Sequence, residues 1–449
     1  MHTKRQTRRL LKTGAVIATL ALALTGCAQG SDSDNPPVSP SDIDAALEKG
    51  GEITVWTWDP AMEPVVENFE AKYPEVTVNL VNAGTGPVEY TALQNAILAG
   101  AGTPDVVSIE YYALPQFTLA ESLADLTAYG AADVKSKFSP SAWESVQSGD
   151  AVYALPYDFG PMAMFYNQSI FDQHGIEVPT TWDEFIAAAA ALHAADPQVY
   201  ITNDTGDPGV MTSLMWQAGG HPFGVDGSAV TIDLSDPETV KFAEMWQQLL
   251  DQQLLAPITT WSDEWYKALA GGNVAALLTG GWMPSLLQSG VPAGAGQWRV
   301  APLPQWAAGD EVSAASGGSS LAIPELSTQK ELAYGFTRYV ASEEGATTRI
   351  DAGTFPALQE VLSSSDFRDK TSDYFGGQKI NEVLADSADQ IAPGWQYLPY
   401  QVYANTIFGD TVGKSFNSST PLTTTLLDWQ AELIRYGETQ GFTVNGAAG

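Results

Sequence analysis

Short apolar strands alternate with amphipathic helices from residue 51 onward, and this order constrains the fold more than any other feature. The segments "EITVWTW" and "VTVNLV" alternate as strands do, and "DVVSI" (105–109) has the continuous apolar character of a buried strand. Helices are predicted between them, one starting at Asp59-Pro60 with Asp59 as N-cap, the next at Pro87. The βαβαβ order predicts a right-handed parallel sheet, and therefore an α/β fold.

Polar and aromatic side chains follow all three predicted strands. In parallel sheets, ligands bind beyond the carboxyl ends of the strands. Trp58 and Asp59 follow the first strand, residues 82–86 the second, and Glu110 and Tyr112 the third. We expect these residues to converge on a ligand, although Asp59 could serve only as a helix cap and Glu110 could be a solvated charge.

A second unit follows "YALPYDFGPMAMFYN" (153–167). Thr181 and Glu184 form a candidate capping box for the helix "WDEFIAAAAALHAA". Strands are predicted at "VYIT", "NVAALLT" (273–279), "WRVAPLP" and "SSLAIP", and a final helix around "TTTLLDWQAELIRYG". About 400 residues exceed one ordinary hydrophobic core, so we expect two domains.

The N-terminus has the pattern of an export signal. Residues 1–12 contain five Lys or Arg and no acid, and an apolar run from Ala15 to Leu24 follows. This run is shorter than the about 20 apolar residues of a spanning helix. The general export route fits best, and Arg8-Arg9 leaves the twin-arginine route open.

The only cysteine of the chain, Cys27, ends this segment. Residues 24–27, "LTGC", resemble the bacterial lipobox, whose cysteine becomes the lipidated first residue of the mature protein. The alternative is a stray thiol in an ordinary signal. Residues 28–42 are mainly Gly, Ser, Asp and Pro, so we assign 1–26 to the signal and 27–49 to an anchor and flexible tether. The protein would then be held at the extracellular face of the bacterial cytoplasmic membrane by lipid alone.

The composition is strongly acidic, with 53 Asp and Glu against 20 Lys and Arg and a net charge of −33. Loss of the five basic residues of the signal would lower this charge to −38. Nucleic-acid binding depends on cationic neutralisation of phosphates, so this charge excludes nucleic acid as an expected partner and disfavours anionic ligands.

Seven stretches together resemble one known family. They are "GEITVWTW", "FEAKYPEVTVNLV", "GTPDVVSIE", "YALPYDFGPMAMFYN", "VPTTWDEFIAAAAAL", "AALLTGGWM" and "SSLAIP", which occur in the family's order across residues 50–440. The chain resembles the extracellular solute-binding proteins, family 1 (sugar-type), of ABC importers. The resemblance implies a monomer without cofactor that passes its ligand to the transmembrane subunits of a permease.

The same resemblance implies two α/β lobes joined by a hinge of crossing segments, with the ligand in the cleft between them. Crossings are expected near Tyr157–Phe159, near Ser319–Ile323 and within 356–380. Lobe 1 would then comprise 50–157 and about 320–370, and lobe 2 would comprise 158–319 and about 371–449.

A carbohydrate offers apolar C–H faces to aromatic rings and hydroxyl groups to carboxylates and amides. Trp282 is the strongest candidate, because the two preceding glycines allow close backbone approach. Trp216 could instead be helix core, Asp158 could orient backbone, and either Trp261 or Trp265 should line the cleft. Ser316–Ser320 and Thr354-Phe355 match positions near the family's cleft. The predicted ligand-binding residues are Trp58, Asp59, Glu110, Tyr112, Tyr157, Asp158, Trp216, Trp261, Gly281, Trp282, Trp395 and Tyr400.

Signatures of enzymes are weak in this sequence. His174, His193 and His221 lack metal-ligand spacing, no G-x-S-x-G motif occurs, and Glu89 replaces the third glycine of a dinucleotide fingerprint. We therefore predict a receptor for a neutral mono- or oligosaccharide rather than an enzyme. A secreted glycosidase, which needs two carboxylates flanking one bond, and a receptor for a polyol or another small polar solute are the alternatives.

The lipobox interpretation makes a direct prediction. Cys27→Ala should release the protein into the medium with its ligand binding intact, because the tether separates the anchor from the folded body. Blotting of membrane and medium fractions measures this. Retention of the alanine variant on membranes would contradict lipidation at Cys27.

Overall fold

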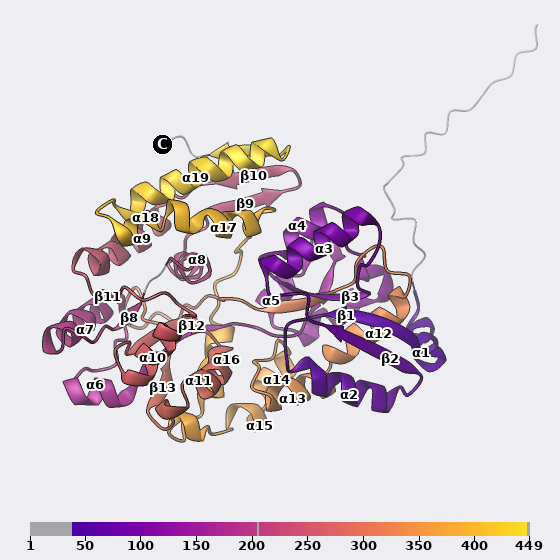
Figure 1. Ribbon diagram of the computed structural model, residues 1–449, viewed down its shortest axis with the longest axis horizontal. Helices are drawn as coiled ribbons and strands as arrows, with labels where there is room; N and C mark the ends of the chain where they lie inside the picture. Colours follow the sequence, from indigo (N-terminus) through magenta and orange to yellow (C-terminus); the bar gives the residue numbers. More distant parts are fainter. Residues whose placement is uncertain (1–37, 204–205, 447–449) are drawn as a thin grey trace, which may run out of the picture. The chain divides into compact units, whose positions relative to one another are not determined.

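The computed structural model describes residues 38–203 and 206–446 (Figure 1). The predicted signal, Cys27 and the first part of the tether lie outside these residues. The tether was assigned to extend to residue 49, but helix α1 (Pro40–Lys49) already begins at Pro40. Ile43 and Leu47 lie one turn apart on it, and both are buried where α1 packs on α12 (Lys330–Val340).

A five-stranded sheet with the order β2-β1-β3-β14-β6 forms the core of the N-terminal part. The predicted parallel arrangement is confirmed, since β1 pairs in parallel with both β2 and β3. Strand β14, from much later in the chain, joins antiparallel between β3 and β6. The strands are β1 (Gly51–Trp56), β2 (Val76–Val81), β3 (Val106–Glu110), β6 (Ala154–Pro156) and β14 (Ser319–Ala322).

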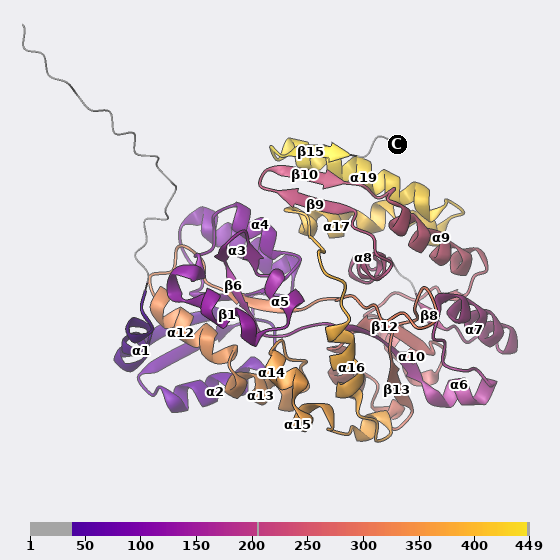
Figure 2. The same cartoon turned by 180° about the vertical axis from the view of Figure 1, so that it is seen from behind.

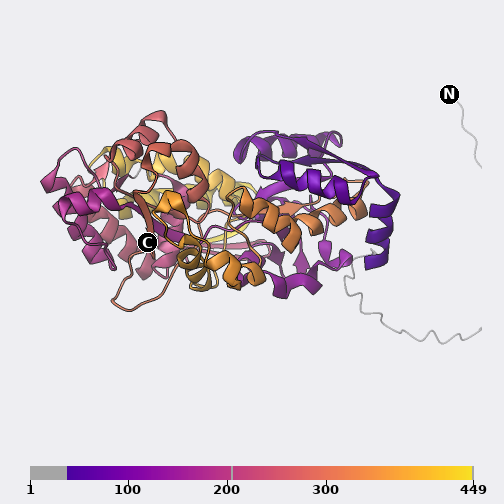
Figure 3. The same cartoon turned by 90° about the horizontal axis from the view of Figure 1, so that it is seen from below.

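Helices cover both faces of this sheet, with α3 on one side and α2 on the other (Figure 1). Figure 3 shows the orange helices of the later sequence among the indigo N-terminal elements, in agreement with the packing of α12 on α1 and of α13 on α2. The sheet interior is apolar, and Ile53, Val55 and Ile109 are fully buried. Each such side chain contributes about 1.5–3 kcal/mol through burial. The helices are α2 (Met62–Lys72), α3 (Pro87–Ala99), α4 (Leu114–Leu119), α5 (Pro140–Glu144) and α13 (Glu343–Asp351).

The predicted start of α2 is wrong by two residues, because the N-cap is Ala61 rather than Asp59. The helix begins at Met62, and Asp59 Oδ1 instead accepts the N–H of Ala61 at 2.9 Å in the preceding turn. The other carboxylate oxygen of Asp59 is bound to Arg349. A distant partner therefore fixes Asp59 in a turn rather than at the helix N-cap.

The second part contains an antiparallel sheet with the order β12-β7-β13, in which β7 (Met162–Asn167) lies between β12 (Ala276–Gly280) and β13 (Trp298–Ala301). The capping box of Thr181 and Glu184 is confirmed at the start of α7 (Trp182–Ala195). The strand predicted at 199–202 is misplaced: Tyr200 makes only an isolated bridge, and β8 (Thr202–Asn203) pairs with β11 (Leu255–Ala256).

Figure 2 shows β15 beside β10, with α19 packed on them. Among the described residues, no helix combines the length and apolar character needed to cross a bilayer. Other elements of this part include β9 (Phe223–Asp226), β10 (Ala229–Ile232), β15 (Thr443–Gly446), α6 (Gln168–His174), α8 (Pro208–Gln217), α9 (Pro237–Asp251), α10 (Asp263–Gly271), α11 (Met283–Gly290), α16 (Ile380–Asp389), α17 (Gln401–Thr411) and α19 (Leu422–Thr439).

Two segments that connect the two sheets run side by side and antiparallel. The first leads from β6 into β7, and the second leads from β13 into β14. Ser316 N donates to Gly160 O at 2.7 Å, and Tyr157 N donates to Ser319 O at 3.1 Å. The segment after α13 joins them, because Phe159 N donates to Phe355 O at 3.1 Å. We call residues 156–162 and 314–320 the crossing pair. The lobe boundaries remain predictions.

Close approach of the crossing pair predicts an effect of a single methyl group. A Cβ at Gly160 would lie well inside contact distance of the Ser316 carbonyl oxygen. We expect Gly160→Ala to lower the free energy of unfolding by about 1–3 kcal/mol, as overpacking does. An added Cβ at Gly409, in α17, would meet nothing within 4 Å among the described residues beyond its chain neighbours and the backbone of its own helix. Gly409→Ala should therefore be neutral or stabilise by up to about 1 kcal/mol. Urea unfolding of both variants measures this, and equal stabilities would contradict the close approach.

Candidate functional site

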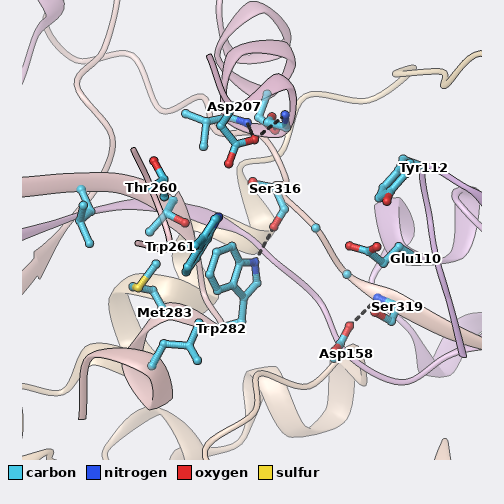
Figure 4. Close-up of a pocket in the computed structure, with 18 of the residues that line it drawn as sticks. Glu110, Tyr112, Asp158, Asp207, Thr260, Trp261, Trp282, Met283, Ser316 and Ser319 are labelled. Atoms are coloured by element: carbon cyan, nitrogen blue, oxygen red, sulfur yellow. Dashed lines mark hydrogen bonds between the residues drawn. The ribbon is translucent and has the colours of Figure 1, made fainter. Parts of the chain in front are cut away.

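A cavity of about 1110 Å³ opens beside the crossing pair (Figure 4). Its wall comes from the carboxyl ends of β1 and β3, from the crossing pair itself, and from residues near α8, α10 and α11. Eight of the predicted ligand-binding residues lie on this wall: Trp58, Asp59, Glu110, Tyr112, Tyr157, Asp158, Trp261 and Trp282. Ser316, Ser319, Thr354, Phe355 and Trp265 also line it.

Glu110 is positioned by a buried tyrosine. Its carboxylate accepts a hydrogen bond from the hydroxyl of Tyr90 at 3.0 Å, and its own N–H donates to the same hydroxyl oxygen at 3.0 Å. The Tyr90 ring also meets Trp58 and Tyr112 edge to face, with centroids 6.3 and 6.2 Å apart. Burial raises the pKa of Glu110 above its usual value. The strand-end residues thus form one cluster, as the parallel-sheet rule predicts.

Trp261 and Trp282 form an aromatic wall on the other side of the cavity (Figure 4), with ring centroids 5.7 Å apart. The indole N–H of Trp282 donates to the Ser316 carbonyl of the crossing pair at 2.8 Å. Gly280 and Gly317 allow this arrangement, because a Cβ at either position would crowd the indole nitrogen. The Trp282 indole is therefore held by a hydrogen bond to Ser316 and lies close to the backbone of Gly280 and of Gly317.

Trp261 has an unusual backbone. Its side chain is 48% exposed, and its φ of 68° lies in the left-handed region. Non-glycine residues seldom adopt this conformation, and such strain clusters at functional sites. Behind it, Trp265 is buried and donates its indole N–H to Asn203 Oδ1 at 2.9 Å. Of the two candidates, Trp261 presents the exposed ring and Trp265 supports it.

Four predicted residues do not line the cavity. Trp216 is buried in α8, donates to Ala392 O at 2.7 Å, and stacks on Trp395 with an interplanar angle of 11°. Tyr400 is buried against aromatic residues of the C-terminal segment. A Cβ at Gly281 would meet Phe355 and Pro161 at 3.3 Å. The contacts of these residues are those of packing.

Several residues that line the cavity are not among those predicted from the sequence. Asp207 caps α8 by accepting the N–H of Gly209 at 2.8 Å, and burial raises the pKa of Asp207. The dipeptide Asp207-Pro208 signals a helix start, which could have identified the cap but not the cavity. The other missed polar residues on the wall include Asn203, Thr260, Tyr397, Gln401 and Asn405.

The cavity wall is acidic. It contains Asp59, Glu110, Asp158 and Asp207, and no Lys, Arg or His within the described part of the chain. Burial raises the pKa of Asp158 to about 7, an effect that Arg349 opposes and Asp59 reinforces. Carboxylates accept hydrogen bonds from hydroxyl groups and repel anions. Residues 38–203 and 206–446 contain no group of three His, Cys, Asp or Glu that could hold a metal ion.

Comparison with known proteins identifies several relatives. A lactose-binding protein of Rhizobium radiobacter is 27% identical, over 76% of this chain and 83% of the relative. An arabinooligosaccharide-binding protein of Halalkalibacterium halodurans is 26% identical, over 80% of this chain and 82% of the relative.

A solved structure is more similar still. It is the ABC transporter associated binding protein of B. animalis subsp. lactis Bl-04 in complex with beta-1,6-galactobiose. It is 44% identical, with a TM-score of 0.81 over 88% of this chain and 99% of the other. Its match and those of other two-lobed binding proteins show the expected two-lobed α/β fold. The pattern of the bacterial extracellular solute-binding proteins matches residues 57–347, and this chain belongs to that family.

Proposed function

We propose that this protein is the carbohydrate-binding component of an ABC importer and captures a neutral oligosaccharide. The observation that carries the proposal is the combination of an exposed aromatic wall with four carboxylates and no cationic side chain among the described lining residues. The aromatic faces suit the C–H faces of sugar rings, and the carboxylates suit their hydroxyl groups. Relatives whose names specify lactose and arabinooligosaccharides support this ligand class.

The size of the cavity favours more than one sugar unit. Its volume of about 1110 Å³ exceeds the roughly 300–1,000 Å³ of pockets for drug-sized ligands. Trp261 and Trp282 lie across it from Glu110 and Tyr112 (Figure 4). An extended oligosaccharide could stack on the first pair while its hydroxyl groups reach the second.

A ligand that contacts both sides can favour closure of the hinge. Trp58 and Glu110 precede the crossing pair in sequence, and Trp282 lies between its two segments. A ligand shifts a conformational equilibrium only by its differential affinity for the two states. We propose that the closed complex delivers its sugar to the transmembrane subunits of a permease, and that Cys27 holds the receptor on the extracellular face of the membrane by a lipid anchor.

Titration with sugars tests this function. We expect calorimetry with β-1,6-galactobiose and a panel of neutral oligosaccharides to show saturable binding by at least one, with the sugar recovered unchanged and a smaller radius of gyration in solution scattering. A disaccharide carrying a uronic acid should bind at least about tenfold more weakly than its neutral counterpart, because its charge faces the carboxylates. Hydrolysis of the sugar would favour the glycosidase alternative, and equal affinity for the uronate would contradict the electrostatic argument.

Trp261 provides the sharpest test of the aromatic wall. Trp261→Ala should weaken binding of the best neutral sugar at least about tenfold, as loss of an aromatic anchor does. The melting temperature of this variant should hardly differ from that of the wild type. The Trp261 ring is half exposed, and alanine at this positive φ is no more strained than tryptophan.

Trp306 is the matched control. It is half-buried outside the cavity wall and donates to Gln217 at 2.8 Å, so Trp306→Ala should lower stability while affinity is retained. Affinity loss in Trp306→Ala equal to that in Trp261→Ala would show that the effect does not arise from stacking.

A further inference from the structure

Arg349 lies directly behind the cavity wall without forming part of it. It is on α13, and its side chain is 1% exposed. Its Nη2 donates to Asp59 Oδ2 at 2.8 Å and its Nε donates to the same oxygen at 3.3 Å. Its Nη1 donates to the carbonyl oxygen of Tyr157, and its guanidinium lies over the Tyr157 ring, 4.2 Å from the centroid. One buried cation thus contacts two wall residues.

These contacts join three segments that are far apart in the sequence. Asp59 belongs to the turn after β1, Tyr157 to the first segment of the crossing pair, and Arg349 to α13. The second segment is reached through Asp158, which accepts a hydrogen bond from the backbone N–H of Ser319. The guanidinium is 3.7 Å from Asp158 as well. The planar fork of an arginine suits such multiple contacts, which a lysine cannot reproduce.

The charges around Asp158 require this cation. Three charged groups face Asp158: Arg349 from α13, Asp59 from the turn after β1, and Glu110 from the end of β3. The phenol of Tyr111, which follows β3, also lies beside it and donates to the Asp158 carbonyl oxygen at 2.7 Å. Only Arg349 is positive, and removing one partner of a buried ion pair leaves an uncompensated charge. Without Arg349, Asp59 and Asp158 would repel each other in a poorly solvated place.

We propose that Arg349 is a positioning residue of the binding site, which holds Asp59 and the Tyr157–Asp158 segment in the geometry that accepts hydrogen bonds from ligand hydroxyl groups. It acts through these residues and does not touch the ligand. The ligand part of this inference rests on the proposed function, whereas its electrostatic part does not.

The first experiment needs no ligand. Carboxylates are charged above their pKa, so Arg349→Met should destabilise the protein more at pH 8 than at pH 5, where protonation relieves the repulsion. A carboxyl group whose pKa is higher in the folded state than in the unfolded state makes the protein less stable as the pH rises from the lower of these values to the higher. Thermal unfolding at both values measures this. Adding Asp158→Asn to Arg349→Met should remove much of the pH-dependent loss.

Arg338 supplies the control. It forms a surface ion pair with Asp44 at 2.7 Å, so Arg338→Met should cause a small loss with little dependence on pH over this range. A loss in Arg349→Met that is equal at pH 5 and pH 8 would show that Arg349 contributes packing only and would overturn the proposal.

The second experiment measures affinity for the neutral sugar that the wild type binds best in the panel. Arg349→Met should bind it at least about tenfold more weakly. Arg349→Lys keeps the charge and serves as the test if the methionine variant does not fold. It should bind the sugar at least about threefold more weakly than the wild type. Wild-type affinity in a folded Arg349→Lys or Arg349→Met variant would overturn the positioning role. If the wild type binds no sugar in the panel, the proposed function fails, while the pH experiment still decides the electrostatic role of Arg349.

Discussion

The backbone pairing of the two crossing segments is the contact on which the rest of the structure depends. Ser316 N donates to Gly160 O, and the carbonyl oxygen of Ser316 accepts the indole N–H of Trp282. Three residues later, Ser319 O accepts from Tyr157 N, and Ser319 N donates to the Asp158 carboxylate. The same few backbone groups therefore connect the two sheets and orient one aromatic and one acidic residue of the cavity. A change in this pairing would alter the wall and the connection together.

Among the described residues, the charged side chains of the cavity wall are all acidic, and two features of the structure reduce the repulsion between them. Arg349 compensates Asp59 and Asp158 from behind the wall. Glu89, fully buried on α3, has a pKa raised to about 8 by burial and by Glu110, so it is mostly neutral at pH 7 and adds little charge near Glu110. The remaining negative charge faces the cavity, where it can accept hydrogen bonds from hydroxyl groups and repels anions.

The sequence predicted what local rules determine. Alternation located β1 and β2, a continuous apolar run located β3, and the strand-end rule pointed to Trp58, Glu110 and Tyr112, which lie on the cavity wall. Contacts across long separations were beyond such rules. Arg349 is 290 residues from its partner Asp59, and nothing in the sequence around it distinguishes it from other arginines in the last turn of a helix. In "GWQYLPY", Trp395 and Tyr400 were the predicted ligand-binding residues, but Tyr397 lines the cavity. Periodicity does not determine the direction of side chains in such an irregular segment. The helix at 40–49 was missed because its polar flank resembled the tether.

If the crossing pair acts as the proposed hinge, the glycines of its second segment are the positions at which it would bend. Gly317 and Gly318 have φ values of 75° and 113°, and a Cβ on Gly318 would collide with the Tyr111 ring. Backbone that only glycine adopts readily lies between Ser316, which holds Trp282, and Ser319, which holds Asp158. Rotation about these two residues would change the position of the aromatic wall relative to the acidic cluster while leaving each internally intact. Ligand contact with both clusters would then act on the few torsions that separate them, which is the condition for binding energy to favour closure.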